Sequence, residues 1–289
     1  MTRKEFGLRE CAVKTAFYEN DLEQAVSMVM RLIDRSPSKK FYRFRPPKMH
    51  EINALENNEI YLCRPAVYED EGDCEILYDI AELCRYFMLE MKPKKYERLY
   101  DYVNNKLMDE IVSRMENEPR FKKMRDEIRN ECLVACITQN NTKYMWENYA
   151  QNGEGICLEY DMADVLLGHD SMLKIFPVRY VEDRNKTEDI FFTSKELNDT
   201  DEAFDNARRK YLLSCMTKNR IPFSQEREWR LLCEYQELND GENGKLYDFV
   251  PPTKIVLGKN ISKHPEFMEK VLEYALNKKI DVEQYKVCE

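Results

Sequence analysis

The beginning of the chain shows helical periodicity. In residues 5–36, apolar side chains recur at spacings of three and four, which is the period of a helix that buries one face. Asn20 or Asp21 is placed to cap a second helix within this stretch. The residues that follow, "SPSKK" at 36–40, are typical of a short linker. The pattern therefore predicts an N-terminal helical extension over residues 1–38.

The remainder of the chain alternates between strand-like and helix-like segments. Short apolar or alternating runs predict strands at 41–45, 59–65, 132–138, 153–161, 174–181, 228–235, 251–259 and at the end of the chain. Helical periodicity predicts helices at 48–58, 143–150, 196–218 and 265–279, and dominates from 76 to 131. Strands and helices are mixed without strict alternation, which is typical of the α+β class. We therefore predict one α+β domain over 40–289, with a single mixed sheet and a large helical insertion at about 76–131.

Composition and charge narrow the classes of function. The chain has 289 residues, 43% of them hydrophobic, which is enough for a sizeable core. Its 45 basic and 54 acidic residues give a net charge of −9, which argues against broad attraction to nucleic acids or membranes but allows a local basic cleft. No apolar run approaches the roughly 20 residues of a membrane span, and the start lacks the apolar stretch of a signal peptide. A cytoplasmic protein without membrane contact is expected.

Metal-binding and phosphate-binding motifs are missing from the sequence. The ten cysteines are scattered without a CxxC pair, and the three histidines lie far apart, so no Cys/His metal site is expected. There is no GxxxxGK[ST] loop, no GxGxxG, no GxSxG and no HExxH. With only eight glycines in the chain, a standard nucleotide-cradling loop is not expected.

The stretch "SQEREWRLLCEY" places two carboxylates at the entrance to an apolar strand. Glu226 and Glu228 are two positions apart, a spacing that puts both on one face of a strand, where like charges repel. One interpretation is structural: Arg230 pairs with either carboxylate while Trp229 enters the core. The other is functional: the carboxylates face a substrate whose positive centre relieves the repulsion.

Several segments together resemble a bacterial family. These are "FYRFRP" followed by "INALENNEIYLCRP", then "MWENYAQNGEGICLEYD", "QEREWRLL" and "IVLGKNI". In this order they resemble the family catalogued as domain of unknown function 2971, over residues 41–260. That family usually carries an Asn-Asp-Pro element after the second strand, where this chain has "VYEDEGDCE", with Asp70 and Glu75 in the acidic positions. The resemblance implies no activity, and it leaves out the N-terminal helices.

A second resemblance concerns the order of the elements. An aromatic-Arg strand, a short helix, a second strand and a late ExE resemble the layout of the ADP-ribosyltransferase superfamily. By that likeness Arg43, beside Tyr42, would hold NAD, while the second strand offers Tyr61 but no Ser-Thr-Ser run. The resemblance implies an NAD-using enzyme, either an ADP-ribosyltransferase or an NAD glycohydrolase, of the kind found among toxins and defence effectors.

The chemistry of NAD cleavage explains why such a site needs these residue types. Breaking the nicotinamide–ribose bond passes through an oxocarbenium-like state, which a fixed carboxylate stabilises. Glu228 would take this role, and Glu226 would orient or deprotonate the acceptor, which is water, a protein or a nucleic acid. The further candidate contacts to a nucleotide are Tyr42, Arg43, Tyr61, Trp146 and Arg230. We therefore expect Tyr42, Arg43, Tyr61, Glu226 and Glu228 to line one cleft.

Two other functions fit the same residues. The carboxylates Asp70, Asp73, Glu75, Glu226 and Glu228 would form a Mg²⁺ site in a metal-dependent nuclease, although Lys218 precedes the late pair rather than lying beside it. A non-enzymatic effector module that binds a nucleotide or a partner protein is the other alternative, with residues 1–38 as a candidate partner site. The sequence leaves all three functions open.

Overall fold

The computed structural model describes most of the chain. It describes all residues except 69–71, 80, 84–85, 87–121, 123–125, 127, 131, 198–199, 235–237, 240 and 286–289. Most of the predicted helical insertion at 76–131, together with Asp70, lies outside the described residues. The first described residues of the insertion form a short strand, β3 (Leu77–Tyr78), because they pair in parallel with β8 (Phe191–Phe192).

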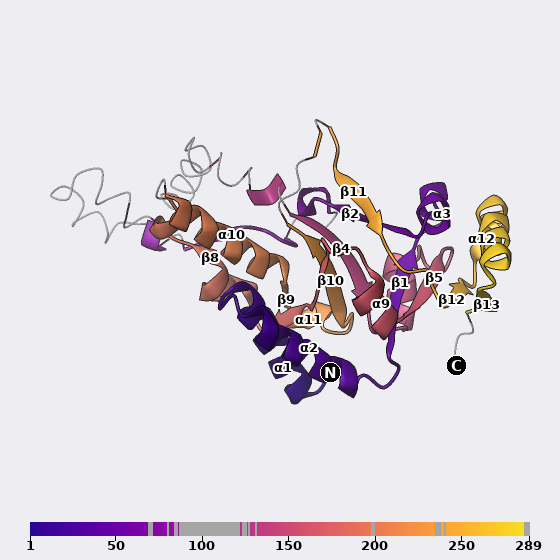
Figure 1. The fold of residues 1–289 in the computed structure, drawn as a ribbon, viewed down its shortest axis with the longest axis horizontal. Helices are drawn as coiled ribbons and strands as arrows, with labels where there is room; N and C mark the ends of the chain where they lie inside the picture. Colours follow the sequence, from indigo (N-terminus) through magenta and orange to yellow (C-terminus); the bar gives the residue numbers. More distant parts are fainter. Residues whose placement is uncertain are drawn as a thin grey trace.

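The fold is α+β, as predicted, and is built on a main mixed sheet (Figure 1). In the described part of the chain this sheet has nine strands. They are β1 (Lys40–Arg45), β2 (Glu59–Cys63), β4 (Leu133–Thr138), β5 (Ile156–Asp161), β6 (Lys174–Pro177), β10 (Glu228–Cys233), β11 (Gly244–Asp248), β12 (Lys254–Leu257) and β13 (Asp281–Gln284). Two short parallel ladders accompany it, β3 with β8 and β7 (Arg179–Val181) with β9 (Thr217–Asn219).

The strand order places β4 at the centre of the sheet. The order is β11-β2-β4-β1-β5-β12-β13, with β10 paired to β4 and β6 paired to β10. β10 pairs with β4 along its whole length, whereas β1 pairs with β4 at Thr138 and β2 pairs with it at Val134. β1 and β2 therefore share the other edge of β4. Within the sheet all pairs are antiparallel except β12 with β13.

Helices flank this sheet. They are α1 (Arg3–Phe17), α2 (Leu22–Arg35), α3 (Met49–Glu56), α8 (Lys143–Tyr149), α9 (Met162–Gly168), α10 (Asp201–Cys215), α11 (Arg220–Phe223) and α12 (Pro265–Lys278). The N-terminal pair α1 and α2 forms a hairpin that packs beside β6, β7 and α10, while α3 packs with α12 near the other end of the sheet (Figure 1). Asp21 caps α2, since its carboxylate accepts a hydrogen bond from the Gln24 amide at 3.0 Å. The described helices include none with the length and apolar composition needed to cross a membrane.

One boundary differs from the prediction in a way that matters for the site. The helix predicted over 196–218 begins at Asp201 and ends at Cys215, after which the chain enters β9. Thr217 ends the helix locally, because its hydroxyl donates to the Leu213 carbonyl at 2.6 Å and accepts from Arg179 Nε at 2.6 Å. Lys218 therefore lies on a strand and not at the end of a helix.

Alternation along the strands gives the sheet two different faces. Phe41 and Trp229 meet edge to face at 5.2 Å on the face that carries the large core. On the opposite face, Phe44 packs in a small cluster that includes Trp146. Along β4 every side chain is buried except that of Cys136, which is exposed although β4 is central. The second face is therefore open to solvent at Cys136.

Candidate functional site

The two carboxylates of the "ERE" segment converge through a turn rather than along a strand. β10 begins at Glu228, and Glu226 lies in the turn before it. Arg227, between them, adopts a left-handed backbone conformation with φ of 49°. The backbone of the turn is held because the Thr138 hydroxyl donates to the Glu226 carbonyl. The expectation that both carboxylates occupy alternate positions of one strand was wrong in this respect, although both side chains are buried and meet at one point.

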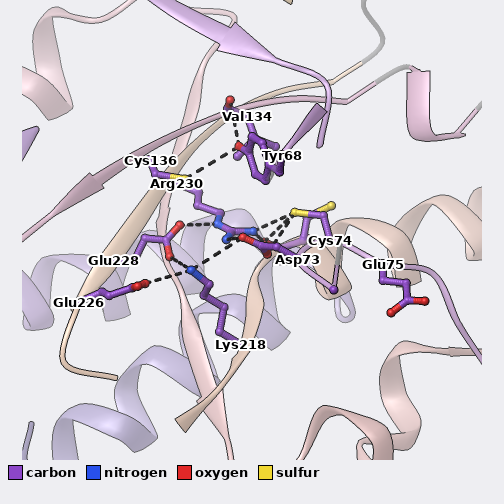
Figure 2. A network of polar contacts seen from close by, with 12 residues as sticks. Tyr68, Asp73, Cys74, Glu75, Val134, Cys136, Lys218, Glu226, Glu228 and Arg230 are labelled. Carbon is purple, nitrogen blue, oxygen red and sulfur yellow. Dashed lines mark hydrogen bonds and ion pairs between the residues drawn. The ribbon is translucent and has the colours of Figure 1, made fainter. Parts of the chain in front are cut away.

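Lys218 is the group at which they meet. Its Nζ lies 2.9 Å from Glu226 Oε2 and 2.8 Å from Glu228 Oε2, with Asp73 Oδ2 at 3.8 Å (Figure 2). The ammonium is nearly buried and also lies over the Phe223 ring, 4.7 Å from its centroid. Lys218 precedes the carboxylates in the sequence but lies beside them in the structure, because β9 pairs with β7 and carries Lys218 back to the entrance of β10.

Arg230 binds the other oxygen of Glu228. The Arg230 side chain is fully buried, and its Nε donates to Glu228 Oε1 at 2.7 Å. Its Nη2 donates to Asp73 Oδ2 at 2.6 Å, and its Nη1 lies 2.9 Å from the Cys74 sulfur and donates to the Cys215 carbonyl (Figure 2). Two cations thus separate three carboxylates, which explains how like charges are tolerated at the entrance to a core strand.

The protonation of the two glutamates is driven in opposite directions. Burial and the neighbouring Glu228 charge raise the pKa of Glu226, only partly opposed by Lys218. Burial also acts to raise the pKa of Glu228, but Arg230 and Lys218 outweigh it and hold that pKa far below its usual range. Burial lowers the pKa of Lys218, yet the surrounding carboxylates, Glu228 first, bring it well above the ordinary value. Glu228 therefore stays ionised, while Glu226 is the carboxylate of the pair that titrates more readily.

The cluster lies on the sheet face that is exposed at Cys136, although the side chains of Lys218, Glu226, Glu228 and Arg230 are themselves buried. The strand register pairs Tyr42 with Thr138 and Thr138 with Glu228, which places these three side chains in a row across β1, β4 and β10. Arg230 lies opposite the exposed Cys136 in the same way. The hydroxyl of Tyr149 donates to Glu226 Oε1, and Tyr149 is 39% exposed. A ligand on this face would approach Glu226 beside Tyr149.

The structure brings together some of the predicted site residues and separates others. Glu226, Glu228 and Arg230 contact one another directly or through Lys218, and Tyr42 shares their face. Tyr61 also shares this face by the register of β2, is 41% exposed and lies over Gly244, where a Cβ would meet the Tyr61 ring.

Arg43 and Trp146 are placed differently. Arg43 alternates with Tyr42 and projects from the opposite face, where it pairs across with Leu158; in the described chain neither carboxylate contacts its guanidinium. The predicted cleft therefore does not include Arg43, because adjacent strand residues face opposite sides. Trp146 is buried, stacks on Tyr285 at 4.6 Å, and donates from its indole nitrogen to Asn141 at 3.0 Å. This is the arrangement of a core anchor.

The acidic residues proposed for a Mg²⁺ site are only partly together. Asp73 joins Glu226 and Glu228, but Lys218 occupies the space between the carboxylates that a divalent ion would take. The Glu75 carboxylate points away from the cluster (Figure 2). The Glu75 backbone carbonyl accepts a hydrogen bond from the Ser214 hydroxyl at 2.7 Å. Within the described residues, no group of three or more His, Cys, Asp or Glu side chains is arranged to hold a metal ion.

Comparison with protein families gives a match to part of the chain. Residues 145–231 match the model of the family described as protein of unknown function (DUF2971), which confirms the resemblance over this part of the chain. The matched range contains Lys218, Glu226, Glu228 and Arg230, whereas Tyr42 lies outside it. No curated protein and no solved structure matches the chain.

Proposed function

We propose that the protein cleaves the nicotinamide–ribose bond of NAD and passes ADP-ribose to water or to an acceptor molecule. The observation that carries this proposal is the pair Glu226 and Glu228, two buried carboxylates that meet at Lys218 and have pKa values driven apart. Carboxylate pairs that divide protonation in this way are the machinery of glycosidic bond cleavage, with one group permanently charged and one able to exchange a proton.

Glu228 is suited to stabilise the developing positive charge. Lys218 and Arg230 fix both of its oxygens and keep it ionised, so it needs no reorganisation during the reaction. When the bond between ribose C1′ and the nicotinamide nitrogen breaks, nicotinamide leaves with the bonding electrons and becomes neutral. The ribose then carries the positive charge as an oxocarbenium ion next to the Glu228 carboxylate.

Glu226 is suited to activate the group that captures this ion. An acceptor hydroxyl or a water molecule donates its hydrogen bond to Glu226 in place of Tyr149, loses its proton to the carboxylate and bonds to C1′. Tyr42 and Tyr61, on the same face, offer aromatic surface to the nicotinamide or adenine ring. Because depletion of NAD or modification of a partner would arrest a cell, the proposed activity fits a cytoplasmic toxin or anti-phage defence effector.

The test is incubation of the purified protein with NAD labelled in the adenine ring, in the presence and absence of cell lysate. We expect free nicotinamide in both samples, and label bound to protein or nucleic acid if the reaction is a transfer. Saturable binding of labelled NAD without release of nicotinamide would instead support a nucleotide-binding effector module. Neither binding nor release at millimolar NAD would overturn the proposal.

A further inference from the structure

The first helix reaches the segment that carries both carboxylates. Arg9 of α1 is fully buried, and its Nη1 donates to the Glu228 carbonyl at 2.8 Å and to the Val178 carbonyl at 3.2 Å. Its Nη2 donates to Gln139 Oε1 at 2.8 Å and lies 3.5 Å from the Arg227 carbonyl. The guanidinium therefore ties the entrance of β10 to the end of β4 and to the residue after β6.

Glu5 lies one helical turn before Arg9 in α1. It binds Arg227, the residue between the two carboxylates. Glu5 Oε1 accepts from Arg227 Nη2 at 2.7 Å and from Arg227 Nε at 3.1 Å, and lies 3.7 Å from Arg9 Nε. Glu5 and Arg9 are one helical turn apart, so both project from the same side of α1. The two side chains form a single clamp, which we call the α1 clamp.

The clamp acts on a backbone conformation that does not form readily by itself. Arg227 has a positive φ of 49°, a region in which a side chain with a Cβ is strained and glycine is not. This conformation directs Glu226 and Glu228 toward the same ammonium of Lys218. Contacts from outside the segment must therefore stabilise it. The clamp supplies two of them, and Tyr180 supplies a third by accepting from the Glu228 amide at 2.8 Å.

We propose that Glu5 and Arg9 are positioning residues that hold Glu226, Arg227 and Glu228 in the conformation required at the site, so that the N-terminal helix is part of the functional unit. The effect of these residues on turnover rests on the proposed cleavage of NAD, while their effect on the conformation of residues 226–230 does not. Any displacement of α1 would release the carboxylates from Lys218, which makes the hairpin a means of controlling the site.

The test combines Glu5→Gln and Arg9→Lys with Arg227→Gly. Hydrogen exchange is measured on the peptide that spans 226–230 and, as a reference, on β5 at 156–161. We expect Glu5→Gln and Arg9→Lys to accelerate exchange in 226–230 by about tenfold or more and to leave β5 unchanged. NAD cleavage should fall by about 10- to 100-fold in turnover with little change in KM, since the groups that bind substrate are intact.

Arg227→Gly separates positioning from general stability. Glycine adopts the left-handed conformation without support, so Glu5→Gln should have little further effect on exchange or turnover in the Arg227→Gly background. Lys14→Met is the matched control, because it removes the contact of α1 with Asp189 at 3.3 Å, away from the carboxylates, and should change neither readout.

Three outcomes would overturn the proposal: unchanged exchange in 226–230, equal acceleration in β5, or an undiminished effect of Glu5→Gln beside Arg227→Gly. If Arg9→Lys does not fold, the Glu5→Gln and Arg227→Gly pair carries the same test. A protein that shows the exchange pattern but cleaves no NAD would retain the clamp and lose the proposed function. If the wild-type protein cleaves NAD but hydrogen exchange in 226–230 is unaltered in the variants, the proposed function stands and the α1 clamp does not.

Discussion

At the level of single residues, Lys218 and Arg230 explain why two glutamates stand two positions apart in a buried place. Each cation binds a different oxygen of Glu228, and Lys218 also binds Glu226. The structural interpretation of "EREWR", a salt-bridged lock with Trp229 in the core, is thus present in the molecule. It does not compete with the functional one, since a carboxylate fixed by two cations is also a preorganised electrostatic group.

Replacement of Glu228 by glutamine should therefore affect stability as well as turnover. The substitution leaves Lys218 and Arg230 without one buried negative partner, a change that costs about 1–3 kcal/mol. NAD turnover should fall by about two orders of magnitude or more, because the charge beside the ribose is lost. Urea denaturation and nicotinamide release are measured on the same preparation. A variant with unaltered stability would contradict the role of Glu228 in the charge network.

The opposite pKa shifts predict opposite dependences on pH. The depressed pKa of Glu228 contributes stability that is present above the unfolded value of 4.5 and lost as the pH falls below it. The raised pKa of Glu226 contributes stability that is present below 4.5 and lost as the pH rises through the folded value.

Denaturation from pH 3 to 8 checks this assignment of the two glutamates. Glu228→Gln should flatten the loss of stability on acidification. Glu226→Gln should lower the free energy of unfolding least, relative to the wild-type protein, near pH 8. Parallel curves for the two variants would show that the glutamates do not titrate differently.

At the level of elements, the sequence predicted those helices and strands whose position depends on neighbouring residues. The cap at Asp21, the strand at 41–45 and the apolar strand at 132–138 follow from capping and periodicity, and the structure confirms them. The end of α10 was misplaced because its apolar pattern continues into β9, and the stop at Cys215 depends on contacts of Thr217. No local pattern placed Lys218 and Asp73 together in an ion-pair network, since their partners lie far from Asp73 in the sequence.

Helix α8 offers a prediction about Trp146. The ring lies between Phe44 and Tyr285, with centroids at 5.1 and 4.6 Å, and its indole N–H is bonded to Asn141. Trp146→Ala should therefore destabilise the protein by about 3–5 kcal/mol, as expected when a large buried aromatic is removed. Tyr149→Phe, on the exposed side of the same helix, serves as the control and should cost far less. A Trp146→Ala loss below about 1 kcal/mol, by urea denaturation, would show that the ring is not a core anchor.

At the level of the whole molecule, the site depends on pairings that no local pattern specifies. The sequence indicated an aromatic strand, a second strand and a late ExE, but not that β4, rather than β2, lies between β1 and β10. Pairings across such separations are set by the packing of the complete sheet, so Thr138 went unnoticed. Arg43 was expected in one cleft with Tyr42, although adjacent strand residues face opposite sides. The N-terminal helices, outside the family resemblance, likewise contact the "ERE" segment.

We propose that Glu226 and Glu228 form a carboxylate pair, divided in protonation, that cleaves NAD. The most direct measurement is nicotinamide release from NAD as a function of pH by the wild-type protein, Glu226→Gln and Glu228→Gln. We expect release by the wild type to follow a group whose pKa lies above 4.5, and this dependence to be lost in Glu226→Gln. Release by Glu228→Gln should be at least about 100-fold slower. Equal rates in all three proteins, or no release by the wild type at millimolar NAD, would contradict it.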